Sequence, residues 1–173
     1  MKTLIFSFVL FTMSLPGYSQ TDSFPHSWKG NWKGELFWYQ GAGKEPKKVM
    51  MQLRIDKLDS NYTWQLIYGD NGSDVRPYKL LPVDTAKGHW RIDENNGIII
   101  DMYWLAGRLS GAFTVGQATI VTSYRLEEDK LVAEFYNISA KPVSTTGQGT
   151  TESPTVNSYG LRSYQRAALH RVN

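Results

Sequence analysis

Hydrophobic and polar residues alternate with a period of two along most of the chain beyond residue 30. Residues 49–56, with the sequence Val-Met-Met-Gln-Leu-Arg-Ile-Asp, show the pattern most clearly. A period of two places successive side chains on opposite faces of a β-strand. Together with aromatic and β-branched runs between turns, the pattern predicts strands over residues 32–39, 49–56, 62–68, 76–83, 88–94, 98–105, 108–115, 118–126, 131–139 and 159–172.

The strongest local signal is a hairpin around Asn95-Asn96-Gly97, between residues 88–94 and 98–105. Asn-Gly supplies the positive φ angles that a tight hairpin turn requires. By contrast, Pro77 and Pro82 lie within residues 76–83 and weaken that strand, because proline cannot donate a hydrogen bond to a neighbour. We therefore expect residues 76–83 to form an edge strand or a strand broken by a kink.

Residues 140–158 interrupt the pattern, since they consist largely of Ser, Thr, Gly, Gln and Pro. This composition predicts a long mobile loop. Residues 159–172 follow as a closing strand, although 165–169 would also suit a helix.

About ten short strands without a convincing helix between them predict an all-β sandwich or barrel. We favour a barrel, because closure removes exposed strand edges. The predicted fold is a single antiparallel up-and-down β-barrel of about 8–10 strands.

The first residues have the features of a secretory signal peptide. Lys2 precedes an apolar run, and small residues lie before Gln20. This order predicts a signal peptide over residues 1–19, a flexible leader over 20–27 and a barrel domain over 28–173. The apolar run is shorter than the ~20 residues that span a bilayer, so we expect a secreted or periplasmic protein that does not span the membrane after cleavage.

The composition limits which covalent bonds can stabilise the protein and which partners it can bind. The chain has no cysteine, so neither a disulfide nor a lipidated cysteine is available to the exported domain. Its formal charge of +3 becomes +2 when Lys2 leaves with the signal peptide. Such a small charge without a basic cluster predicts no nucleic-acid partner.

Gly30-Asn31-Trp32, at the start of the first strand, is similar to the Gly-x-Trp motif of lipocalins and other calycins. Residues 28–171 also resemble small lipocalin-like proteins exported by bacteria. In calycins the tryptophan closes one end of the barrel, and an arginine from near the final strand packs across it. The resemblance therefore implies that Gly30 and Trp32 close the barrel together with Arg166 or Arg171. The cysteine pair common in the family is absent here.

A small barrel is either filled by side chains or wide enough to hold one small ligand. The chain is rich in aromatic residues, which serve both purposes. We expect a non-catalytic protein, without a cofactor, that binds a small apolar or amphipathic molecule in the barrel interior. The candidate lining residues are Trp38, Trp64, Tyr68, Trp90, Trp104, Tyr124 and Phe135.

Three alternatives remain open. Asp101 and Glu134 lie on apolar strands and would form an acid and base pair for sugar hydrolysis if both faced the interior. His170, on the closing strand, would be a haem ligand by analogy with some ten-stranded barrels. Residues 140–158 would instead bind a partner protein in the cell envelope.

Other catalytic and metal-binding motifs are lacking. The sequence contains no Gly-x-Ser-x-Gly, no His-Glu-x-x-His and no complete phosphate-binding loop. His26, His89 and His170 show no metal-ligand spacing. We therefore expect no metal site.

Overall fold

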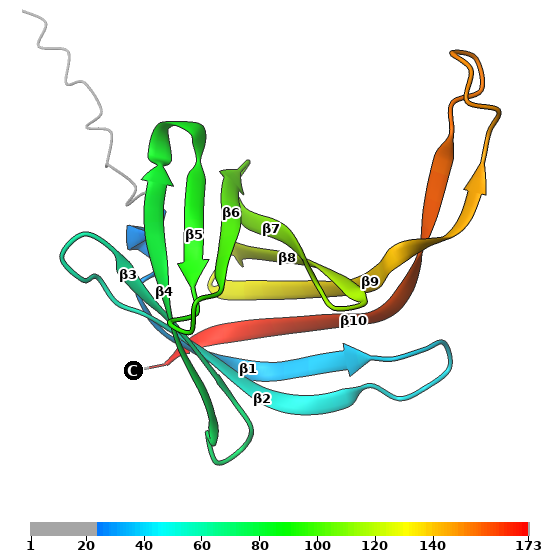
Figure 1. Cartoon of the computed structure of the whole chain (residues 1–173). Coiled ribbons are helices and arrows are strands. Elements are labelled where there is room, and N and C mark those ends of the chain that lie inside the picture. The colour runs from blue at the N-terminus through cyan, green and yellow to red at the C-terminus, as the bar shows by residue number, and fades with distance from the viewer. Residues whose placement is uncertain (1–23, 173) are drawn as a thin grey trace, which may run out of the picture.

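Each strand of the protein pairs with the strand before it, and the last strand pairs with the first (Figure 1). The structure, a computed structural model, describes residues 24–172. Its strands are β1 (Gly30–Tyr39), β2 (Lys47–Ile55), β3 (Tyr62–Tyr68), β4 (Asp74–Asp84), β5 (His89–Asp93), β6 (Ile99–Leu105), β7 (Arg108–Val115), β8 (Ala118–Glu127), β9 (Lys130–Thr146) and β10 (Val156–Val172). All pairings are antiparallel, and β1 against β10 closes the barrel. The prediction of a single up-and-down barrel is confirmed.

Alternation along the strands separates the core from the surface. On β2, Met51, Leu53 and Ile55 are fully buried, whereas Arg54 between them is exposed. On β6, Ile100 and Met102 are buried, whereas Asp101 and its neighbours on the outer face are exposed. The period-two pattern therefore identifies the inner face of these strands correctly.

Closure brings β1 and β10 very close together at Gly34. A Cβ atom at this position would lie 2.3 Å from the backbone oxygen of Ala168. Only glycine fits such an approach, because real Cβ contacts do not reach this distance.

The expectation of an edge or broken strand at residues 76–83 is wrong, because β4 pairs with both β3 and β5. Pro77 lies opposite Gln65 on β3, and Pro82 lies opposite Trp90 on β5. The β4–β5 register shifts between Pro82 and Asp84. Proline is tolerated within a sheet where the strand pairing is irregular, as it is next to Pro82.

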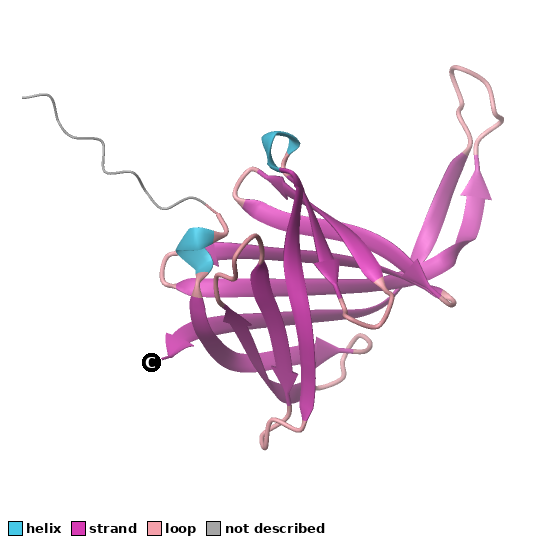
Figure 2. Ribbon diagram, turned by 60° about the vertical axis from the view of Figure 1, so that its left-hand side comes forward, coloured by secondary structure: helices cyan, strands magenta, loops and turns pink. Residues whose placement is uncertain are grey.

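A hairpin arm replaces the long loop expected over residues 140–158. Strand β9 continues to Thr146 and β10 begins at Val156, so the connecting turn covers only residues 147–155. The strands pair across Thr146 and Val156 and across Pro142 and Tyr159. In two views the arm projects away from the barrel (Figures 1 and 2). Cross-strand hydrogen bonding of the backbone explains why a composition typical of loops is found in strands.

The start of the described chain also differs from the flexible leader expected over residues 20–27. Pro25 is buried, and a short 3₁₀ helix, η1 (His26–Trp28), follows it. A second 3₁₀ helix, η2 (Thr85–Lys87), joins β4 to β5. The predicted signal peptide and residues 20–23 lie outside the described residues.

Candidate functional site

One end of the barrel is filled by aromatic rings. Trp28 and Trp32 are both 2% exposed, and the Trp32 indole nitrogen donates a hydrogen bond to the Trp28 carbonyl at 2.8 Å. The Phe24 ring stacks on Trp104 with 4.1 Å between ring centroids, and it forms a T-shaped contact with Trp90 at 5.2 Å. Trp28 also lies 6.4 Å from Trp64 between ring centroids. We call these six residues the aromatic plug: Phe24, Trp28, Trp32, Trp64, Trp90 and Trp104.

Arg171 covers the plug from β10. Its Cζ atom lies 4.5 Å from the centroid of Trp32, and its guanidinium donates to the carbonyls of Lys29 at 2.6 Å and Ser27 at 3.1 Å. Gly30, with φ of +127°, lies beneath this guanidinium, where a Cβ atom would be 3.2 Å from Nη1. Arg166, the other candidate, instead lies 3.7 Å from Glu127. The structure therefore places Arg171, and not Arg166, beside Trp32.

Beyond the plug, the barrel contains a cavity of about 230 Å³. Its apolar wall comes from β3 and from β5 to β8, through Leu66, Ile92, Ile100, Met102, Phe113 and Ile120. Five further aromatic residues also line it, namely Tyr68, Tyr78, Tyr124, Phe135 and Tyr136. Polar groups complete the lining, namely Arg76, Glu94, Thr122, Asn137 and Gln165.

The seven aromatic residues expected to line one site are divided among different positions. Tyr68, Tyr124 and Phe135 line the cavity. Three others, Trp64, Trp90 and Trp104, belong to the aromatic plug. Trp38 is half-buried on β1, with the Lys47 ammonium 5.6 Å from its ring centroid.

The polar residues of the cavity were not among those predicted from the sequence. At its mouth, the Arg76 guanidinium lies 4.8 Å above the Tyr68 ring and forms two hydrogen bonds to Asp74, at 3.1 and 2.8 Å. These bonds lower the pKa of Asp74 and keep the pair charged. Burial raises the pKa of the Tyr68 hydroxyl, although Arg76 opposes the shift. Tyr68 is therefore a neutral phenol at physiological pH.

Two inward residues of β8 form the deep polar part of the cavity. Thr122 is 4% exposed and Tyr124 is 2% exposed. Burial raises the pKa of Tyr124 to about 12, so its hydroxyl keeps its proton. The Thr122 hydroxyl and the Trp64 indole nitrogen lie near the Tyr124 hydroxyl, but neither has a hydrogen-bond partner of good geometry. Alternation with Ile120 and Tyr124 was the sequence signal that placed Thr122 inward.

The structure does not bring Asp101 and Glu134 together. Asp101 lies on the outer face of β6, between the inward residues Ile100 and Met102. Its carboxylate binds Arg91 at 2.9 Å and His89 at 2.7 Å. Hydrogen bonds from these two side chains lower the pKa of Asp101.

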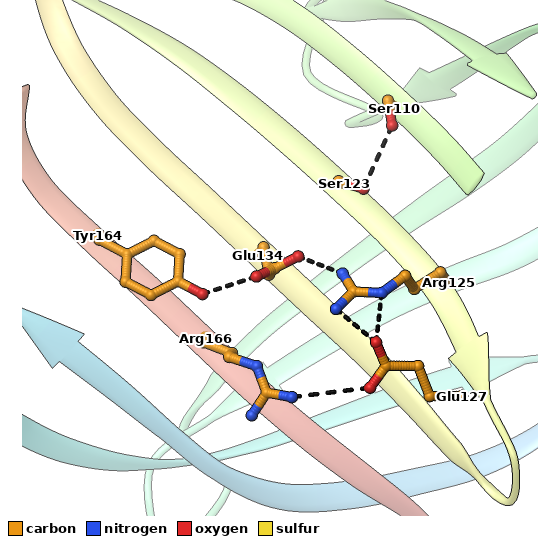
Figure 3. A network of polar contacts seen from close by, with 7 residues as sticks. All are labelled: Ser110, Ser123, Arg125, Glu127, Glu134, Tyr164 and Arg166. Atoms are coloured by element: carbon orange, nitrogen blue, oxygen red, sulfur yellow. Dashed lines mark hydrogen bonds and ion pairs between the residues drawn. The ribbon is translucent and has the colours of Figure 1, made fainter. Parts of the chain in front are cut away.

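Glu134 belongs to a second polar network, on the outer face of the barrel wall (Figure 3). It lies between Ala133 in the core and Phe135 in the cavity wall, and so faces outward. Its carboxylate accepts a hydrogen bond from the Tyr164 hydroxyl at 2.6 Å and is paired with Arg125. The two carboxylates therefore have separate partners outside the barrel, and Asp101 and Glu134 do not form an acid and base pair in the cavity.

His170 is exposed and follows the buried Leu169 on β10, so it does not face the barrel interior. Within residues 24–172, no cluster of three or more His, Cys, Asp or Glu side chains is placed to hold a metal ion. Over the same residues, no helix is long and apolar enough to cross a membrane.

Comparisons with known proteins do not assign the chain to a family. No protein-family model matches the sequence, and no curated protein matches it significantly.

Proposed function

We propose that the protein is a calycin-like, non-catalytic binding protein that acts after export and holds a small apolar or amphipathic molecule in its interior. The observation that carries this proposal is the cavity of about 230 Å³ between the aromatic plug and the opposite end of the barrel. The Gly30 and Trp32 motif, with Arg171 across it, supports the likeness to calycins.

The size and lining of the cavity suit a small ligand. An apolar cavity of ~150 Å³ holds benzene, and drug-sized ligands occupy pockets of ~300 Å³ or more. The cavity lies between these limits. An apolar wall with a few polar groups is the usual composition of a small-molecule site, in which the polar groups fix orientation.

Native mass spectrometry of the chain purified after bacterial export tests the proposal. A retained or added small molecule should appear as a one-to-one complex. The Ile120→Trp variant is the matched control, because Ile120 lines the cavity and a larger ring there would fill it. Equal retention by both proteins, or no uptake from a panel of small apolar compounds, would contradict the proposal.

A further inference from the structure

The cavity wall contains polar atoms that lack a partner within the protein. The Thr122 hydroxyl and the Asn137 side-chain oxygen are both buried without a hydrogen bond. Both residues line the cavity, and they come from the paired strands β8 and β9, where Asn137 lies opposite Ile120. A buried polar group without a partner is costly, so such groups are normally satisfied by water or by a ligand.

The charges at the cavity do not favour an anion. The lining includes one cation, Arg76, and one carboxylate, Glu94. Arg76 is already held by two hydrogen bonds to Asp74, 2.8 and 3.1 Å long. A ligand carboxylate would therefore enter a site with no free cation among the lining residues and with Glu94 nearby, and burying an unpaired charge is unfavourable.

The volume of the cavity limits the size of the ligand's apolar part. The cavity volume of about 230 Å³ is about 1.5 times the ~150 Å³ that accommodates benzene. This ratio corresponds to two fused six-membered rings. The wall around that volume is aromatic and aliphatic, through residues such as Phe135 and Met102.

Building on the proposed function, we infer that the cavity selects an uncharged molecule of about two fused rings whose hydroxyl group binds Thr122. The Thr122 hydroxyl can both donate and accept a hydrogen bond, and the Tyr124 hydroxyl lies beside it. Asn137 offers a further acceptor to a second polar group. The rings then lie against the apolar wall.

Calorimetric titration with naphthalene, 2-naphthol and 2-naphthoate tests the inference, because the three probes share one ring system. 2-Naphthol should bind about 5- to 10-fold more tightly than naphthalene, as expected for one net hydrogen bond. 2-Naphthoate should bind at least ~10-fold more weakly than 2-naphthol, because its charge would be buried without a partner.

Two variants identify the hydroxyl responsible. Thr122→Val keeps the shape of the side chain and should bring the ratio of 2-naphthol affinity to naphthalene affinity down to about one, because only the hydroxyl is lost. Thr122→Ser retains a hydroxyl and should restore the preference. Circular dichroism checks that both variants are folded.

The outcomes separate this inference from the proposed function. Equal binding of naphthalene and 2-naphthol, or a preference that survives in Thr122→Val, would overturn the selection of a hydroxyl and indicate that water satisfies Thr122. Tighter binding of 2-naphthoate would overturn the selection of an uncharged ligand. Failure of all three probes to bind the wild-type protein would instead contradict the proposed function itself.

Discussion

Arg171 lies over the indole ring of Trp32, with 4.5 Å between the guanidinium carbon and the ring centroid. This contact joins the last strand to the first, and the same guanidinium binds the carbonyls of Lys29 and Ser27. Arg171 therefore fastens the segment before β1 to the end of β10. The aromatic plug lies beneath it.

We predict that Arg171→Ala lowers the free energy of unfolding by about 1–2 kcal/mol, because it removes a cation–π contact and two charge-assisted hydrogen bonds. Arg166→Ala is the matched control on the same strand. Its ion pair with Glu127 is 3.7 Å long and exposed, so we expect a change within ~0.5 kcal/mol. Urea denaturation followed by tryptophan fluorescence measures both. A larger effect at Arg166 would refute this assignment.

Gly34 should tolerate no side chain. A methyl group there would approach the Ala168 oxygen to 2.3 Å, so Gly34→Ala should destabilise the barrel by about 1–3 kcal/mol or more. Gly41→Ala, in the turn after β1, is the control, since its nearest contact would be the flexible Lys44 chain at 3.9 Å. Thermal unfolding compares the two. Similar melting temperatures would show that β1 and β10 are less closely packed than described.

The Glu134 network predicts a pH-dependent contribution to stability. Burial alone would raise the pKa of Glu134, but the hydrogen bonds from Tyr164 and Arg125 outweigh it and lower the pKa. The unfolded chain therefore takes up the proton first as the pH falls. The stabilisation is present above the unfolded-state pKa of about 4.3 and is lost as the pH falls through the lower folded-state value.

We predict that Tyr164→Phe costs about 1–2 kcal/mol at neutral pH, because a hydrogen bond to a charged group is lost. The difference from wild type should shrink as the pH falls through the lowered folded-state pKa of Glu134, because the carboxylate then becomes protonated. Tyr39→Phe is the control, since the Tyr39 ring stacks on Tyr164, whereas the Glu134 carboxylate binds the Tyr164 hydroxyl and Arg125. Chemical denaturation over a pH series measures both variants. A pH-independent loss in Tyr164→Phe would rule out the proposed linkage to Glu134.

The hairpin arm should be separable from the barrel. Pro142 and Tyr159 lie opposite each other, so Asn-Gly in place of residues 143–158 would close the hairpin at that pair. Because residues 143–158 are exposed apart from the half-buried Ser153, we expect the melting temperature to change little and naphthalene binding to persist. Loss of binding in this deletion variant would show that the arm contributes to the cavity.

The sequence predicts the barrel well because its signals are local. Alternation and turn residues, such as those around Asn95 and Gly97, need no knowledge of distant segments. The arm was missed because the pairing of Thr146 with Val156 is not encoded by composition.

The cavity was only partly predictable for a related reason. Trp64 and Tyr68 share the inner face of β3, yet one lies in the aromatic plug and the other lines the cavity. Alternation tells which residues face inward. Their depth along the barrel depends on the register of all ten strands, which no single segment specifies.

Methyl NMR spectroscopy during a titration with naphthalene tests the central claim most directly. Ile100 and Ile120 line the cavity, whereas Ile99 and Val121 are their outward neighbours on β6 and β8. We predict saturable shifts and ligand contacts at Ile100 and Ile120, with little change at Ile99 and Val121. Shifts confined to the outward methyl groups, or no saturable shift at any of them, would contradict binding in the barrel interior.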